Sequence, residues 1–123
     1  MTYVPGAFPE TSIYPGPYRL NPDLPTGDWN VFANGRIYTI TIHGISGGAV
    51  KGEMASGTFK DGGYDAKTGI LKFTRELPDG NPQYWSGQLM YYSAEDTSHR
   101  MAGTIDQPNI RQTGSWYATL ARS

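Results

Sequence analysis

The chain has 123 residues, a formal net charge of −1 from 10 basic and 11 acidic side chains, and no cysteine. This length suits one domain with a modest core, the charge gives no support for a nucleic-acid surface, and disulfides, a thiol nucleophile and thiolate metal sites are excluded. No apolar run is long enough to cross a membrane, so we expect a cytoplasmic protein, although a mature secreted form without its signal peptide would look the same.

Residues 1–26 are predicted to form a Pro-rich and aromatic-rich N-terminal arm, ahead of a β-barrel in residues 27–123. Six of the nine prolines lie in this arm, and proline this dense cannot pair into a sheet. Aromatic and aliphatic residues stand between the prolines, which disordered tails usually lack. We predict an extended, ordered arm, with Tyr14, Tyr18 and Leu20 packed on the barrel or on a neighbouring chain. A leader without such contacts is the alternative.

From Gly27 onward the chain divides into eight runs of strand character separated by turn residues. Asn34-Gly35, between the first two runs, is a strong two-residue hairpin signal. The expected strands are 28–33, 36–43, 49–54, 58–64, 70–76, 83–92, 99–105 and 115–122. Short strands at this regular spacing predict an all-β fold, an eight-stranded antiparallel up-and-down β-barrel.

The run Gln83–Tyr92 is the most aromatic of the eight. Trp85, Gly87, Leu89 and Tyr91 alternate along it, so they share one face of the strand. This face is bulky and apolar around a glycine, as expected where a strand bends inside a small closed barrel. We therefore expect it to point into the interior.

Several short motifs resemble the avidin and streptavidin family, in the same order along the chain. The motifs are Gly27-Asp28-Trp29, Gly63-Tyr64-Asp65, Trp85-Ser86-Gly87-Gln88 and Trp116-Tyr117-Ala118-Thr119, and together they span nearly all of residues 27–122. The first motif is shared with lipocalins and other calycin-type barrels. The resemblance implies a barrel of this type, in which Ser56 would match a serine of the biotin site and Trp85 and Trp116 two of its aromatic walls.

The match to the biotin site is incomplete. Met54 stands where the family has a tyrosine, and Asn30 lies one position early, on the outer face. The family's seventh-strand tryptophan is missing from residues 101–105, and its acidic residue would fall past Ser123. A ureido group buried without polar partners is costly, so we expect the ligand not to be biotin.

The connections predict which end of the barrel is open. Alternate connections of an up-and-down barrel share one end, and the two longest, 77–82 and 106–114, fall together at the expected mouth. Trp29 is expected to plug the other end. Near the mouth Arg75 shares a face with apolar residues, which indicates contact with an anionic or carbonyl ligand; an ion pair with Asp61 is the alternative. The expected ligand-binding residues are Arg75, Trp85, Trp116, Ser56, Met54, Phe73, Tyr38 and Tyr91.

Three classes of function remain open. The first is binding of a small, mostly apolar ligand in a calycin-like cavity. The second is a cofactor-independent cyclase or isomerase that folds its substrate in the same cavity. The third is a packed barrel that acts as an interaction or oligomeric protein. We expect a small-molecule partner, with a homo-oligomer left open, and no cofactor, metal, nucleic acid or membrane partner; His43 and His99 lack metal-ligand spacing, and the catalytic residues stay unknown.

Overall fold

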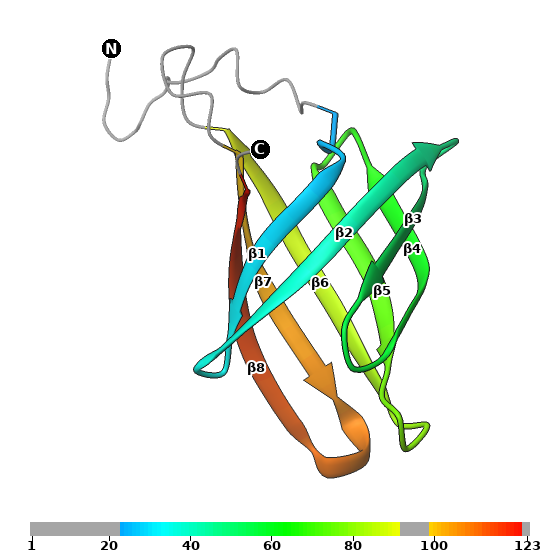
Figure 1. Cartoon of the computed structure of the whole chain (residues 1–123), viewed down its shortest axis with the longest axis vertical. Helices are drawn as coiled ribbons and strands as arrows, with labels where there is room; N and C mark the ends of the chain where they lie inside the picture. Colours follow the sequence, from blue (N-terminus) through cyan, green and yellow to red (C-terminus); the bar gives the residue numbers. More distant parts are fainter. Residues whose placement is uncertain (1–22, 92–98, 122–123) are drawn as a thin grey trace, which may run out of the picture.

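The computed structural model describes residues 23–91 and 99–121, which form a closed barrel of eight antiparallel strands (Figure 1). Each strand pairs with its neighbours in the chain, and pairing of β1 with β8 closes the barrel. The predicted fold class is thereby confirmed. The strands are β1 (Gly27–Ala33), β2 (Arg36–Ser46), β3 (Ala49–Met54), β4 (Thr58–Asp65), β5 (Ile70–Glu76), β6 (Pro82–Tyr91), β7 (His99–Gln107) and β8 (Gln112–Leu120).

Residues 1–22 lie outside the described part of the chain, and with them most of the predicted arm. The described residues 23–26 cover one end of the barrel. Leu24 is buried there with 3% of its surface exposed, and the indole Nε1 of Trp29 donates a hydrogen bond to the Pro25 carbonyl at 3.2 Å. Trp29 is fully buried, so this is the closed end.

The connection between β7 and β8 differs from the sequence prediction. Residues 106–114 were expected to form the longest break, and this is wrong because Asp106 pairs with Thr113 and Gln107 with Gln112. The chain turns in a single 3-10 turn, Pro108–Ile110, which starts with a proline. Both strands therefore continue to the edge of the barrel. No helix of the described residues is long and apolar enough to cross a membrane.

Side chains alternate between the interior and the outer surface, as the sequence predicts. On β6, Trp85 and Leu89 are buried, whereas Tyr84 and Met90 are exposed. The interior residues with at most 1% of their surface exposed all lie in the closed half or at mid-height: Trp29, Val31, Ile40, Ile42, Leu71, Met101 and Ala118. The closed half is therefore filled by side chains, and any room for a ligand lies toward the other end.

The seam between β3 and β4 is the shortest of the barrel. Only Ala49 and Val50 of β3 pair across it, with Gly63 and Gly62 of β4. Five residue pairs join β1 to β8. β4 has a bulge between Lys60 and Gly63, where its regular pairing with β5 is interrupted, and the two pairs with β3 lie at this bulge.

Candidate functional site

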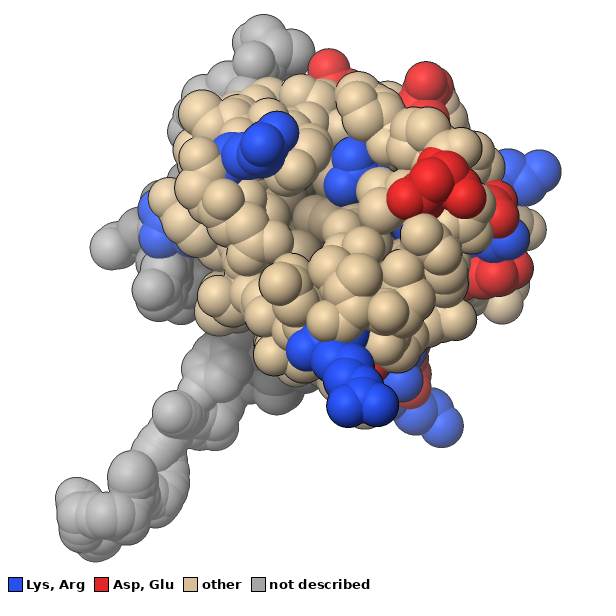
Figure 2. Space-filling view, turned by 90° about the horizontal axis from the view of Figure 1, so that it is seen from below, with Lys and Arg blue, Asp and Glu red and all other residues tan. Residues whose placement is uncertain are grey.

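Four of the connections lie together at the end of the barrel opposite Trp29, at the bottom of Figure 1. They join β1 to β2, β3 to β4, β5 to β6 and β7 to β8. Figure 2 looks onto this end and shows a hollow at its centre, with basic side-chain atoms beside it. The predicted mouth is therefore hollowed at its surface.

Arg75 lies inside the mouth with only 5% of its surface exposed. Its Nη1 donates to Oε1 of Gln83 at 3.1 Å, and its Nη2 donates to the backbone carbonyls of Ala55 at 3.2 Å and Ser56 at 3.0 Å. Its buried Nε has no hydrogen-bond acceptor. A buried guanidinium is thus held by three neutral oxygens, and its Nε is left without an acceptor.

Strand geometry explains why the side chain of Arg75 points inward. Arg75 is two residues beyond Phe73 on β5 and so shares its interior face. The ring of Tyr38 covers the guanidinium, with 4.9 Å from Cζ to the ring centroid. Gly57 lets the β3–β4 turn approach, because a Cβ there would lie 3.1 Å from Cγ and 3.2 Å from Nε of Arg75.

Arg75 has no acidic partner among the described residues. The ion pair with Asp61, the alternative raised by the sequence, is not formed. Asp61 has a left-handed backbone conformation (φ 56°) in the β4 bulge and is exposed, so it does not share the interior face with Phe59. Simple alternation along β4 fails at this bulge, and no acidic side chain of residues 23–91 or 99–121 pairs with Arg75.

Gln83 joins Arg75 to the rest of the mouth. Its Oε1 accepts from Arg75 and also from Nε1 of Trp85 at 3.2 Å, and its Nε2 donates to Oε1 of Gln107 at 2.9 Å. These bonds fix the orientation of the Gln83 amide. Neither glutamine was predicted from the sequence. Gln83 lies two residues before Trp85 on the same strand, so alternation could have placed it on the interior face. Gln107 could not be found in this way, because the sequence prediction placed it in a loop.

A row of aromatic rings forms an apolar wall next to these polar groups, farther inside the barrel. Phe59 stacks on Phe73 with ring centroids 4.5 Å apart, and Phe73 stacks on Trp85 at 5.4 Å. Trp85 meets the tilted ring of Trp116 at 5.4 Å, and Nε1 of Trp116 donates to the Thr104 carbonyl at 3.2 Å. The structure thus brings Phe73, Trp85 and Trp116 together beside Arg75.

The other predicted site residues lie around this centre. Met54 is buried at the end of β3, 4% exposed. Ser56 is exposed in the turn, with φ 60°, and contacts Arg75 through its backbone carbonyl. Tyr38 covers the guanidinium, as described above. The side chain of Tyr91 lies outside the described part of the structure.

Tyr64 is the described residue whose pKa is raised, and it lies away from the mouth. Burial raises the pKa of its phenol, and the negative charges of Asp23 and Asp65 add to the effect. Tyr64 pairs with Leu71, in the closed half. His43 contacts the exposed Glu53 at 2.5 Å on the outer surface. Within residues 23–91 and 99–121 no three His, Asp or Glu side chains gather in a metal-binding cluster.

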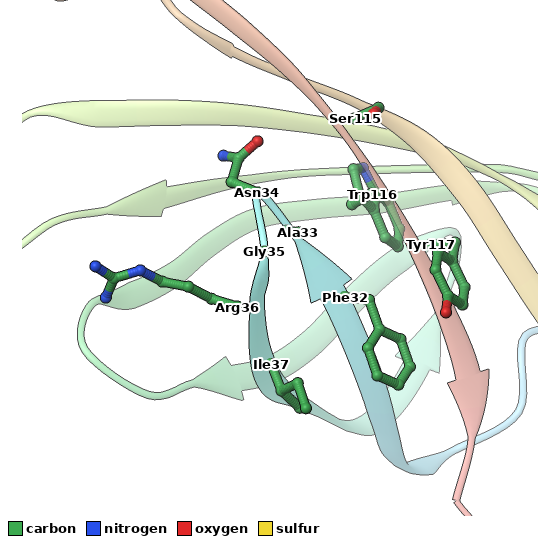
Figure 3. Close-up of a pocket in the computed structure, with 9 residues that line it drawn as sticks. All are labelled: Phe32, Ala33, Asn34, Gly35, Arg36, Ile37, Ser115, Trp116 and Tyr117. Atoms are coloured by element: carbon green, nitrogen blue, oxygen red, sulfur yellow. The ribbon is translucent and has the colours of Figure 1, made fainter.

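A second hollow lies on the outer surface, where the β1–β2 hairpin adjoins β8 (Figure 3). It is lined by Phe32, Ala33, Asn34, Gly35, Arg36, Ile37, Ser115, Trp116 and Tyr117. Phe32 and Tyr117 stack there with centroids 4.8 Å apart. Ile37 is 72% exposed and Tyr117 52%. This groove is open and mostly apolar.

The mouth combines a buried cation, two amide side chains and an aromatic wall. Such a set binds and orients a small molecule through hydrogen bonds, charge and stacking. Comparison of the chain with protein-family models, with curated proteins and with solved structures gave no significant match. A function for this barrel therefore has to be inferred from the mouth itself.

Proposed function

We propose that this barrel binds a small, mostly apolar molecule at its mouth, and that Arg75 holds the polar group of that molecule. One observation carries the proposal: Arg75 is 95% buried, yet the described residues offer no acceptor to its Nε and no acid to its charge. A buried charge without an opposite charge beside it costs stability, and hydrogen bonds to neutral groups offset only part of that cost. A ligand that supplies the missing partner would offset this cost.

The apolar part of the ligand would lie against the aromatic wall. Phe73, Trp85 and Trp116 retain 2–3% exposure, whereas Trp29 and Leu71 in the closed half retain none. Sites for small molecules combine mostly apolar walls with a few polar groups, as here. The ligand would therefore be short, with its polar end beside Arg75 and its apolar end among these rings.

The barrel topology agrees with the resemblance to avidin and streptavidin, and we propose a calycin-like relationship with a changed ligand. We expect no tight binding of biotin, because Met54 offers no hydroxyl at the site of the family's tyrosine. Isothermal titration with biotin should show no nanomolar affinity. The zero cysteine content agrees with a cytoplasmic location, which we keep as part of the proposal.

Native mass spectrometry of protein taken directly from cells tests the proposal. We expect a co-purified small-molecule mass on the wild type, its loss in Arg75→Gln, and its retention in Lys72→Gln, whose side chain is exposed on the outer surface. Circular dichroism of each variant checks that the barrel is folded. Wild-type protein that carries no ligand and binds none of the eight-carbon probes described below would overturn the proposal.

A second candidate function, a homo-oligomer, is favoured by the outer groove. Stacked Phe32 and Tyr117 and the exposed Ile37 form an apolar patch of the kind that often marks an interface. Light scattering should then give a multiple of the 13.5 kDa chain mass, and Ile37→Ser should reduce it. A monomeric wild type would reject this candidate. A cyclase or isomerase would be supported by a residue with a shifted pKa inside the mouth. Tyr64, the described residue whose pKa is raised, lies away from the mouth, so the described residues offer no comparable support for such an enzyme.

A further inference from the structure

Among the described residues, Arg75 has hydrogen-bond partners but no partner of opposite charge. Three acceptors surround the guanidinium, namely the Gln83 amide and the carbonyls of Ala55 and Ser56, and all three are neutral. They supply hydrogen bonds and partial charges, and none carries a full negative charge. What the mouth lacks is an anion rather than another neutral oxygen.

Neighbouring acidic residues do not supply that anion. Glu76 follows Arg75 on β5, so its side chain points to the other face, where it pairs with Lys60 at 3.4 Å. Asp61 is exposed in the β4 bulge. The groups around Arg75 are instead the ring of Tyr38 and the aromatic wall. Water is largely excluded in such surroundings, so a charge interaction is stronger there than at the surface.

We infer that the ligand of this barrel is an anion, with a carboxylate or a similar oxyanion held by Arg75, rather than a neutral carbonyl compound. The inference rests on the proposed function, because it names the chemical class bound at the same mouth. A planar carboxylate matches the fork of donors of a guanidinium. Nε of Arg75 has no acceptor in the structure, so a carboxylate oxygen beside it would meet a donor that no protein group uses.

The positive charge of Arg75 predicts how tightly a carboxylate, an amide and an ammonium of the same chain length should bind. An amide oxygen and a carboxylate oxygen can both accept from the guanidinium, but only the carboxylate adds the attraction between two opposite full charges at a buried site. A carboxylate should therefore bind about tenfold more tightly than the amide of the same length. An ammonium of that length should bind least, because it would meet the positive charge of Arg75.

Isothermal titration of the full chain with octanoate, octanamide and octylamine tests the inference without any substitution. We expect octanoate to bind about tenfold more tightly than octanamide, and octylamine not to bind. In nitrogen-15 spectra, octanoate should shift the Nε–H resonance of Arg75. Equal affinity for octanoate and octanamide would overturn the anion inference and leave the ligand site standing. If all three probes fail to bind and the wild type carries no ligand from cells, the proposed function is overturned, and the inference with it. If the probes fail but the wild type carries a ligand without an anionic group, only the inference is overturned.

Two variants of Arg75 and one control test whether its charge causes the preference for octanoate. Arg75→Gln should abolish the preference for octanoate, and Arg75→Lys should keep part of it. Lys72→Gln is the matched control, since Lys72 is an exposed cation on the same strand. The control should keep the full preference. A preference that survives Arg75→Gln but disappears in Lys72→Gln would place the anion on the outer surface and overturn the inference.

Discussion

The ring of Trp116 lies against the backbone of Gly87, although their strands are separated by β7. A Cβ added at Gly87 would stand 2.7 Å from Cη2 of Trp116. Gly87 itself pairs with Gly103 of β7. The glycine is therefore needed for the space it leaves, which lets the indole cross the interior and end the aromatic row at the mouth.

Gly87→Ala should destabilise the protein by about 1–3 kcal/mol, the usual cost of forcing an extra methyl group into a packed core. Gly44→Ala is the matched control, because a Cβ there would meet no atom within 4 Å. The control should change the free energy of unfolding by no more than about 0.5 kcal/mol. Chemical denaturation of both variants measures the difference, and equal stabilities would show that Trp116 does not need this space.

Leu24 should contribute to stability although it precedes the first strand. Its side chain is 3% exposed in the core cluster, so Leu24→Ala should cost about 2–5 kcal/mol. Ile110→Ala is the control, since Ile110 is 49% exposed in the turn between β7 and β8. The same denaturation experiment compares them. If Leu24→Ala is as stable as the control, residues 23–26 do not close the barrel in solution.

The strands could be predicted from the sequence because alternation and turn residues agree over most of the chain. Ala49–Met54 and Ile70–Glu76 match the prediction at both ends. Gln83–Tyr92 differs from β6 by one residue at each end. In a closed barrel every strand has one buried face, so the apolar residues mark both the strand and its orientation.

Bulges and polar strand ends could not be predicted in the same way. Asp61 takes a left-handed conformation, which aspartate tolerates but which no sequence pattern required. Gln107 and Gln112 pair across β7 and β8, yet their polar side chains around Pro108 resemble a loop. These errors matter most for the candidate site. Gln83 of β6 and Gln107 of β7 form their hydrogen bond only because both strands extend to the mouth.

The N-terminal arm remains a prediction, since Tyr14, Tyr18 and Leu20 lie outside the described residues. We expect the arm to pack on rings of the outer surface such as Tyr84, which is 47% exposed, and Tyr117, which is 52% exposed. Deletion of residues 1–22 should lower the melting temperature of a monomer, or dissociate an oligomer, if the arm covers them. Unchanged melting temperature, solution mass and ligand affinity would show the arm to be a leader.

Tyr64 should make the protein lose stability in alkaline solution. Burial raises the pKa of its phenol above the ordinary value of 10.0, with smaller effects of Asp23 and Asp65. Above pH 10.0 the unfolded chain releases the Tyr64 proton more readily than the folded chain, so the folded state holds more protons. The free energy of unfolding must then fall as the pH rises. Below this pH the phenol is protonated in both states, and the contribution is fully present.

Urea denaturation at pH values on either side of the ordinary tyrosine pKa checks this prediction. The wild type should lose more stability across that interval than Tyr64→Phe, which has no phenol to ionise. Tyr64 has other contacts that the substitution also changes, so the free energies of unfolding at a single pH cannot be compared directly. The quantity to compare is how much each variant's free energy of unfolding falls between the two pH values. Tyr84→Phe, at an exposed tyrosine, should lose stability like the wild type. If Tyr64→Phe loses as much as the wild type, Tyr64 does not cause the alkaline loss of stability.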